Sequence, residues 1–138
     1  MKIMVSACLA GENCKYNGGN NLSQKVLDLL ANNTVITVCP EVLGGLPIPR
    51  VPAEITGDEV INRDGISVDR EYHAGAEKAL AIAQQERPDL IILQSRSPSC
   101  GVKQRYDGTF SGKLIRGPGV TAELLMKYGF HVLDVEDL

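Results

Sequence analysis

Four cysteines are the residues of this 138-residue chain whose type and position could do chemistry. Cys8 lies in VSACLAG, Cys14 in ENCKYNG, Cys39 at the end of TVITVC, and Cys100 in SRSPSCG, directly after DLIIL. Each could be a small buried side chain, because free cysteine is often part of a protein core. Thiolates are also soft ligands that select zinc, copper(I) or iron–sulfur clusters. Their positions relative to the strands decide between these interpretations.

The spacing of the cysteines disfavours several kinds of thiol site. Successive cysteines are 6, 25 and 61 residues apart. Structural zinc sites and dithiol redox sites usually contain a C-x-x-C pair, and the chain has none. A [4Fe–4S] cluster fits better, because three separated loops can hold its cube and three thiolates leave one iron open to substrate. Spacing alone does not identify the metal, and zinc remains the alternative occupant.

The elements that must position these cysteines alternate between strand and helix. Apolar, β-branched segments predict strands over residues 2–7, 34–39, 89–94 and 130–135. Helical spacing of apolar residues predicts helices over 22–33, 69–86 and 119–128. Two turn signals in EITGDEVINRDGISV predict a small β-hairpin or meander insertion. We therefore expect one Rossmann-like α/β domain over residues 1–138. Its three layers are a mostly parallel sheet of about four main strands with helices on both faces.

Local signals predict where several elements begin and end. Ser23 and Asp69 are candidate N-caps of the first two helices, and Gly129 is placed to end the last. The β-branched strand at 34–39 is expected in the interior of the sheet. Residues 40–54 contain four prolines and a Gly-Gly pair, which predict an ordered loop without long regular structure.

This topology predicts that three of the thiols meet. Cys8 follows the first strand, Cys39 ends the second, and Cys100 lies in the loop after the third. The carboxyl ends of the strands of an open parallel sheet lie along one edge, where such folds bind ligands. Three thiols delivered to one edge are hard to explain as independent core residues. His73 and His131 are expected away from this edge.

Four long segments carry a resemblance to a known family: VSACLAGENCKYNGG, CPEVLGGLPIPRVPAEI, SRSPSCG and YDGTFSGKLIRGPGVTAELL. They resemble the small bacterial domain family that includes the thiouracil desulfurases, over nearly the whole chain. The resemblance implies that Cys8, Cys39 and Cys100 ligate a [4Fe–4S] cluster, and it gives Cys14 no ligand role. Lys15 and Asn17 stand where the family more often has Arg and Asp, outside the ligand positions.

The resemblance also implies an activity, the non-redox removal of sulfur from a thiolated heterocycle such as 2-thiouracil. An open cluster iron would bind the soft thiocarbonyl sulfur, so that water attacks the polarised carbon and sulfide is released. Glu41 and Ser97 match the catalytic positions of the family and would move protons. Taken alone, Glu41 could instead accept backbone N–H bonds, and Ser97 could cap a turn. Arg50 and Glu54 are expected to pair with each other and fix their loop.

Composition and charge limit the other function classes. The 14 Lys and Arg and 17 Asp and Glu give a net charge of −3, which argues against nucleic-acid binding by broad phosphate neutralisation. Arg96 and Lys103 are expected on the solvated surface. No apolar run reaches the roughly 18 residues of a membrane span, and the N-terminus does not read as a secretory signal, so a cytoplasmic location is expected.

We expect a small thiolated molecule as the partner, and neither a membrane nor a nucleic acid. The main alternative to an enzyme is a cluster- or zinc-binding module that serves as a sensor or scaffold. Such a module predicts that no pocket adjoins the thiols. Sulfur insertion into a nucleic-acid base ranks last, because it would normally need an ATP-binding loop and an RNA-binding surface, and neither is visible in the sequence.

Overall fold

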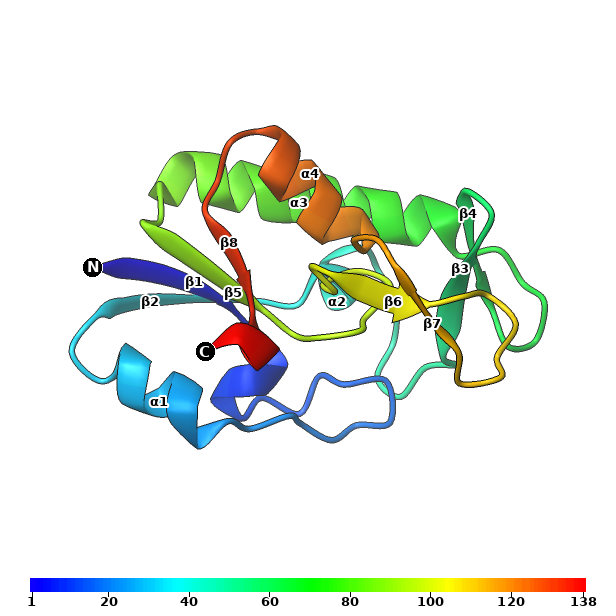
Figure 1. Cartoon of the computed structure of the whole chain (residues 1–138), viewed down its shortest axis with the longest axis horizontal. Helices are drawn as coiled ribbons and strands as arrows, with labels where there is room; N and C mark the ends of the chain where they lie inside the picture. Colours follow the sequence, from blue (N-terminus) through cyan, green and yellow to red (C-terminus); the bar gives the residue numbers. More distant parts are fainter.

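A four-stranded parallel sheet forms the central layer of the protein in the computed structural model, which describes residues 1–138. The sheet has the order β2-β1-β5-β8, whose strands span Thr34–Val38, Lys2–Ser6, Leu90–Leu93 and Val132–Asp134. Figure 1 shows α3 (Asp69–Glu86) and α4 (Val120–Lys127) on one face of this sheet and α1 (Gln24–Leu30) on the other. The three-layer α/β class expected from the sequence is confirmed.

The alternation of side chains along the central strands builds a separate core on each face. Met4, Ile91 and Leu93 pack beneath α3 and α4, where they meet Ala79, Ala83, Ala122 and Leu125. Ile3, Val5 and Ile92 point the other way, and they meet Leu9, Val26 and Leu30. The continuous apolar runs at residues 3–5 of β1 and 90–93 of β5 are therefore covered on both faces. Each fully buried Leu or Ile contributes roughly 1.5–3 kcal/mol to folding.

The helix ends agree with the sequence signals at two of three positions. Ser23 caps α1, because its side chain accepts a hydrogen bond from the Val26 N–H at 3.3 Å. Gly129 follows the end of α4 with a φ of 84°, a left-handed conformation that glycine adopts readily. The expectation for Asp69 was wrong: Val68 is the N-cap of α3, and Asp69 is its first residue. The Asp69 carboxylate instead accepts the Val60 N–H at 3.0 Å, which ties α3 to the strand β4 (Glu59–Asn62).

The strand expected in the interior at 34–39 lies at the edge. Strand β2 pairs only with β1, and Val35 is 38% exposed. β-Branched residues favour any pleated strand, so their presence does not distinguish an edge strand from a central one. The strand ends at Val38, and the proline-rich stretch that follows contains the short helix α2 (Pro40–Leu43).

Helix α2 lies directly against α3 because there is a glycine on each side of the crossing, Gly44 at the C-cap of α2 and Gly75 within α3. A Cβ atom on Gly44 would overlap the Glu71 carbonyl oxygen, and one on Gly75 would overlap the Pro40 carbonyl oxygen. Glycine is the only residue that permits such a close backbone approach. The contact fixes α2 at the carboxyl edge of the sheet.

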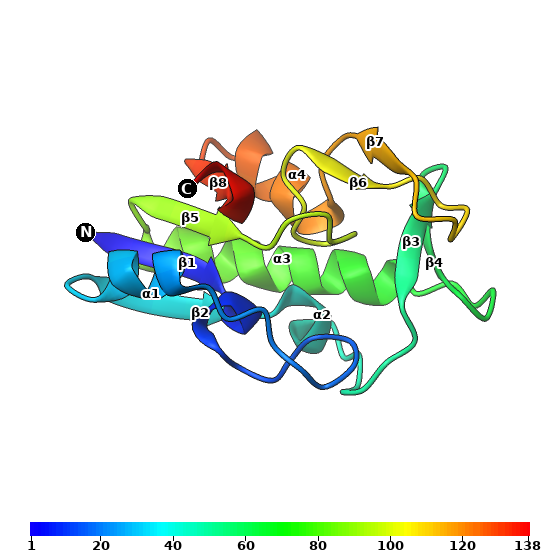
Figure 2. The same cartoon turned by 60° about the horizontal axis from the view of Figure 1, so that its bottom comes forward.

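Two antiparallel hairpins lie beyond the carboxyl ends of the parallel strands (Figure 2). The first pairs β3 (Ala53–Thr56) with β4 (Glu59–Asn62), as expected for the insertion. The second pairs β6 (Gln104–Tyr106) with β7 (Leu114–Arg116), in a part of the chain where no strand was expected from the sequence. Strands of three residues are too short to show a clear alternation. None of the helices combines the length and the apolar composition that crossing a membrane requires.

Candidate functional site

Cys8, Cys39 and Cys100 lie just beyond the carboxyl ends of three neighbouring parallel strands. Cys8 belongs to the 3-10 helix η1 (Ala7–Ala10) after β1, and Cys39 is the N-cap of α2 after β2. Cys100 lies in the loop that leaves β5. All four cysteines are free thiols, and all four line the same cavity. The cavity adjoins the boundary between β1 and β5, where the chain connections diverge and α/β sheets bind ligands.

The cavity has the size of a small-molecule site. Its volume is about 590 Å³, within the range of about 300–1,000 Å³ that is typical of ligand pockets. Glu41 and Ser97 also line it, so the structure brings together all five site residues that the sequence predicts. His73 and His131 are not among the lining residues, as expected.

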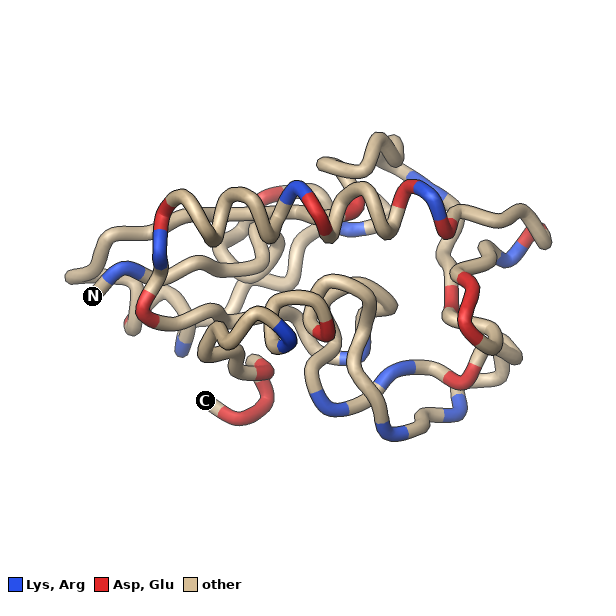
Figure 3. Tube along the Cα trace, turned by 90° about the horizontal axis from the view of Figure 1, so that it is seen from above, with Lys and Arg blue, Asp and Glu red and all other residues tan.

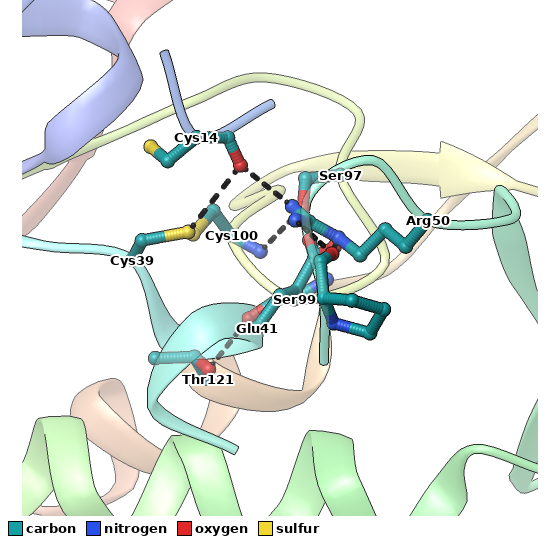
Figure 4. A network of polar contacts seen from close by, with 9 residues as sticks. Cys14, Cys39, Glu41, Arg50, Ser97, Ser99, Cys100 and Thr121 are labelled. Carbon is teal, nitrogen blue, oxygen red and sulfur yellow. Dashed lines mark hydrogen bonds and ion pairs between the residues drawn. The ribbon is translucent and has the colours of Figure 1, made fainter. Parts of the chain in front are cut away.

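Arg50 holds the Glu41 side chain at the wall of this cavity (Figure 4). The Arg50 Nε donates to Glu41 Oε2 at 2.8 Å, and the two side chains are only 6% and 15% exposed. Arg50 also donates from Nη2 to the Cys14 carbonyl oxygen at 2.9 Å. Burial alone would lower the pKa of Arg50, but the Glu41 carboxylate outweighs burial and raises it. The ion pair therefore links α2 to the loop that carries Cys14.

The expected pair between Arg50 and Glu54 was wrong. Glu54 Oε1 instead accepts the backbone N–H groups of Gly108 and Phe110, at 3.0 and 3.1 Å, and so joins the two hairpins. The turn between β6 and β7 offers Glu54 two N–H donors, whereas Arg50 is closer to the carboxylate of α2. The alternative in which Glu41 accepts only loop N–H groups is also wrong, because its hydrogen-bond partner is the Arg50 side chain.

Tyr72 lies within the helix expected over residues 69–86 and was not among the expected site residues. In the structure Tyr72 is 3% exposed, lines the cavity and lies against Glu41. Burial and the neighbouring Glu41 carboxylate both raise the pKa of Tyr72, so its hydroxyl stays protonated. A tyrosine among alanines on a helix carries no signal that could separate this position from an ordinary core residue.

Ser97 shapes the turn that carries Cys100. Its Oγ accepts the backbone N–H groups of Ser99 and Cys100, at 3.1 and 3.0 Å. A hydroxyl that accepts two hydrogen bonds can still donate one, so Ser97 can also bind a molecule in the cavity. The neighbouring Ser99 is buried and shares a 2.7 Å hydrogen bond with Thr121, which anchors the same turn to α4.

The four thiols have different electrostatic surroundings. Burial raises the pKa of Cys8 and raises that of Cys100 to about 12, while hydrogen bonds from Asn21 and Ser6 oppose these shifts. A hydrogen bond with Cys14 lowers the pKa of Cys39 and raises that of Cys14 itself. Cys39 is therefore the thiol that ionises first, with Cys14 as a neutral neighbour.

The thiols are not arranged around a single metal ion. No group of three His, Cys, Asp or Glu side chains is placed to hold one ion. The geometry therefore does not support zinc as the occupant. Three soft donors from separate elements, spaced around one cavity, suit the larger frame of an iron–sulfur cluster.

Two basic residues that were expected at the surface form ion pairs there. Figure 3 shows acidic and basic positions interspersed along the chain. Arg96 approaches Glu136 at 3.3 Å and Lys103 approaches Asp137 at 2.9 Å, with all four side chains substantially exposed. Arg96 also reaches the cavity rim, whereas Lys103 does not line the cavity.

Comparison with known proteins identifies the family. A family model described as 2-thiouracil desulfurase matches residues 3–137. The chain belongs to this family. A relative from Bacillus subtilis (strain 168), the uncharacterized protein YbbK, is 43% identical over 146 residues that cover 99% of this chain and 97% of YbbK.

A solved structure has the same fold as this member of the desulfurase family. It is described as the [4Fe-4S]-dependent thiouracil desulfidase TudS, and it matches with a TM-score of 0.92 and 39% sequence identity. The match covers 99% of this chain and 92% of that one. The family resemblance and the α/β fold class inferred from the sequence are confirmed.

Proposed function

We propose that the protein is a [4Fe–4S]-dependent, non-redox desulfurase that converts a small thiolated heterocycle such as 2-thiouracil to its oxo form. Cys8, Cys39 and Cys100 would hold the cluster, which when bound supplies a soft Lewis-acid iron for the thiocarbonyl sulfur. The observation that carries the proposal is one cavity of about 590 Å³ lined by these thiols together with Glu41 and Ser97. The family match and the description of the TudS structure support it.

The reaction requires a side chain that can accept a proton and then return it. Water adds to the carbon and the sulfur leaves as hydrosulfide, so a C–O bond replaces a C–S bond without any net oxidation. A base must accept a proton from the attacking water, and the proton must then return to the leaving group or the ring. We assign this work to Glu41, the carboxylate two residues beyond Cys39.

Glu41 is held in one orientation for this task. Arg50 Nε donates a hydrogen bond to Glu41 Oε2 at 2.8 Å, which leaves Oε1 as the oxygen that can accept a proton from water. Ser97 Oγ already accepts two backbone N–H groups, so its remaining capacity is to donate. We assign the Ser97 O–H to a hydrogen bond with the heterocycle, which would orient the ring toward Glu41.

The alternative function, a cluster-binding module without catalysis, does not need an adjoining cavity of this size. It predicts that the cluster-loaded protein has no turnover, so that removal of Glu41 changes nothing. The presence of a ligand-sized cavity beside the thiols favours the enzyme.

The test uses anaerobically reconstituted protein incubated with 2-thiouracil. We expect uracil and sulfide in equal amounts from the unchanged protein, and neither iron binding nor turnover from Cys8→Ser, Cys39→Ser or Cys100→Ser. Glu41→Gln should bind iron normally but lose about 100-fold or more in kcat, the usual contribution of a general base. Glu54→Gln is the matched control, because Glu54 lines the same cavity and its amide oxygen can still accept the two hairpin N–H groups.

Two results would contradict parts of the proposal separately. Cluster-loaded protein that leaves 2-thiouracil and other thiolated bases unchanged would overturn the proposed activity. Full turnover by the Glu41→Gln variant would overturn the assigned role of Glu41 and leave the reaction itself in place.

A further inference from the structure

Phe110 has a backbone conformation that bulky residues rarely adopt. It lies in the turn between β6 and β7 with a φ of 56°, in the left-handed region. A residue with a Cβ atom is strained in that region, whereas glycine adopts it readily. Strained residues of this kind cluster at functional sites, where the surrounding structure holds them in place. The turn YDGTFSG thus keeps a phenyl ring at a position that glycine would fill with less strain.

Contacts with the first hairpin hold this turn in place. Glu54 Oε1 accepts the backbone N–H groups of Gly108 and Phe110, and the Thr56 hydroxyl donates to the Gly108 carbonyl oxygen at 3.3 Å. Gly108 also packs so closely on β3 that a Cβ atom there would lie 2.7 Å from the Ile55 carbonyl oxygen. These contacts are made by the backbone of the turn, and none of them uses the Phe110 ring.

The Phe110 side chain lines the cavity that also contains Cys8, Cys39 and Cys100. Arg63 lines the same cavity, and its guanidinium carbon lies 5.7 Å from the centroid of the Phe110 ring. A cation at this distance is attracted to the face of an aromatic ring and so favours one orientation of it. Phe110 belongs to none of the three hydrophobic clusters of the core. Core packing therefore does not explain why a phenyl ring is kept here.

We propose that Phe110 binds the flat face of the substrate heterocycle and so selects planar, conjugated thiolated rings over other thioamides. Because this role concerns the substrate, it rests on the proposed function. Aromatic side chains stack on the face of any base, since every base has a π-face. The contact would therefore read the shape of the ring, while the thiols and Glu41 act at the sulfur-bearing carbon.

Stacking of this kind acts on substrate and transition state alike, because the ring stays flat away from the reacting carbon. Loss of such uniform binding raises KM and leaves kcat nearly unchanged. For Phe110→Leu, which stays apolar but has no ring, we expect KM for 2-thiouracil to rise about 5-fold or more, with kcat within about threefold. Phe110→Tyr keeps the ring and should keep KM close to that of the unchanged protein.

Phe130→Leu is the matched control. Phe130 is the only other phenylalanine of the chain, packs against the core beneath α3 and α4, and does not line the cavity. The same chemical change at this position should leave KM unchanged.

A second substrate tests selection for a flat ring. The ring of 5,6-dihydro-2-thiouracil is neither planar nor fully conjugated. We expect the preference of kcat/KM for 2-thiouracil over this compound to fall about 5-fold or more in Phe110→Leu, and to be unchanged in Phe130→Leu. Intrinsic reactivity cancels in this comparison, because the same two substrates are given to each protein.

Fluorine NMR gives a readout that does not depend on turnover. With only two phenylalanines, cluster-loaded protein labelled with 4-fluorophenylalanine has two resonances, which Phe130→Leu assigns. We expect uracil, the product, to shift the Phe110 resonance and to leave that of Phe130 in place.

Three results would overturn the role of Phe110: an unchanged KM and an unchanged preference in Phe110→Leu, a loss confined to kcat, or a Phe110 resonance that does not move with uracil. Loaded protein that leaves 2-thiouracil unchanged but shows the shift would overturn the proposed function and leave the ring-binding role of Phe110 in place.

Discussion

Replacement of Arg50 by leucine tests how the structure holds Glu41 at the cavity. The substitution removes the 2.8 Å bond to Glu41 Oε2 and the 2.9 Å bond to the Cys14 carbonyl oxygen. Breaking a buried ion pair costs about 3–5 kcal/mol, because one charge stays buried without a partner. The Glu41 side chain is 15% exposed and borders the cavity, so water can hydrate part of it. We therefore expect Arg50→Leu to lower the free energy of unfolding by about 2–4 kcal/mol.

Urea unfolding of the iron-free protein in reducing buffer measures this loss. With about 2 kcal/mol per molar urea for a chain of this size, the midpoint should fall by about 1–2 M. The double variant Arg50→Leu with Glu41→Gln is the control, because it removes the unpaired charge as well as its partner. We expect the double variant to recover part of the loss. A decrease below about 1 kcal/mol in the single variant, or no recovery in the double variant, would refute a buried, mutually stabilising pair.

Three further predictions follow from individual contacts. Gly75→Ala should lower the free energy of unfolding, measured with urea, by about 3 kcal/mol or more, because the added methyl group overlaps the backbone of Pro40. An unchanged urea midpoint would contradict the close helix crossing. In iron-free protein, alkylation of Cys39 should increase as the pH rises through about 6, because the Cys14 hydrogen bond lowers its pKa; peptide mapping that shows an increase only above about pH 8 would contradict this. Ser23→Ala should lower the free energy of unfolding by about 1 kcal/mol, because α1 loses its N-cap, and should leave sulfide release unchanged. A large loss of activity would be inconsistent with a purely structural role for Ser23.

The fold class and the grouping of the thiols could be predicted because both depend on local patterns. Continuous apolar runs identified β1 and β5 as strands covered on both faces. Once the strands were parallel, the residues just after them had to lie at one edge. Cys8, Cys39 and Cys100 line one cavity for this reason.

The partners of the side chains at the site could not be predicted, because they depend on how separate loops cross. Arg50 is near Glu54 in sequence, yet it pairs with Glu41 after the intervening loop folds back on α2. Glu54 instead accepts a backbone N–H from a turn more than fifty residues away in the sequence. The edge position of β2 was missed for a related reason, since strand order is a property of the whole sheet and not of one segment.

In the proposed function, three cysteines that follow three different strands hold one iron–sulfur cluster. Crystals grown without oxygen from reconstituted protein, measured at the iron absorption edge, would show which residues bind the iron. We expect one cluster-sized anomalous peak in the cavity, bonded to the Sγ atoms of Cys8, Cys39 and Cys100, with one iron free of protein ligands. Iron bonded to Cys14 in place of one of the three, or iron bound elsewhere on the molecule, would contradict it.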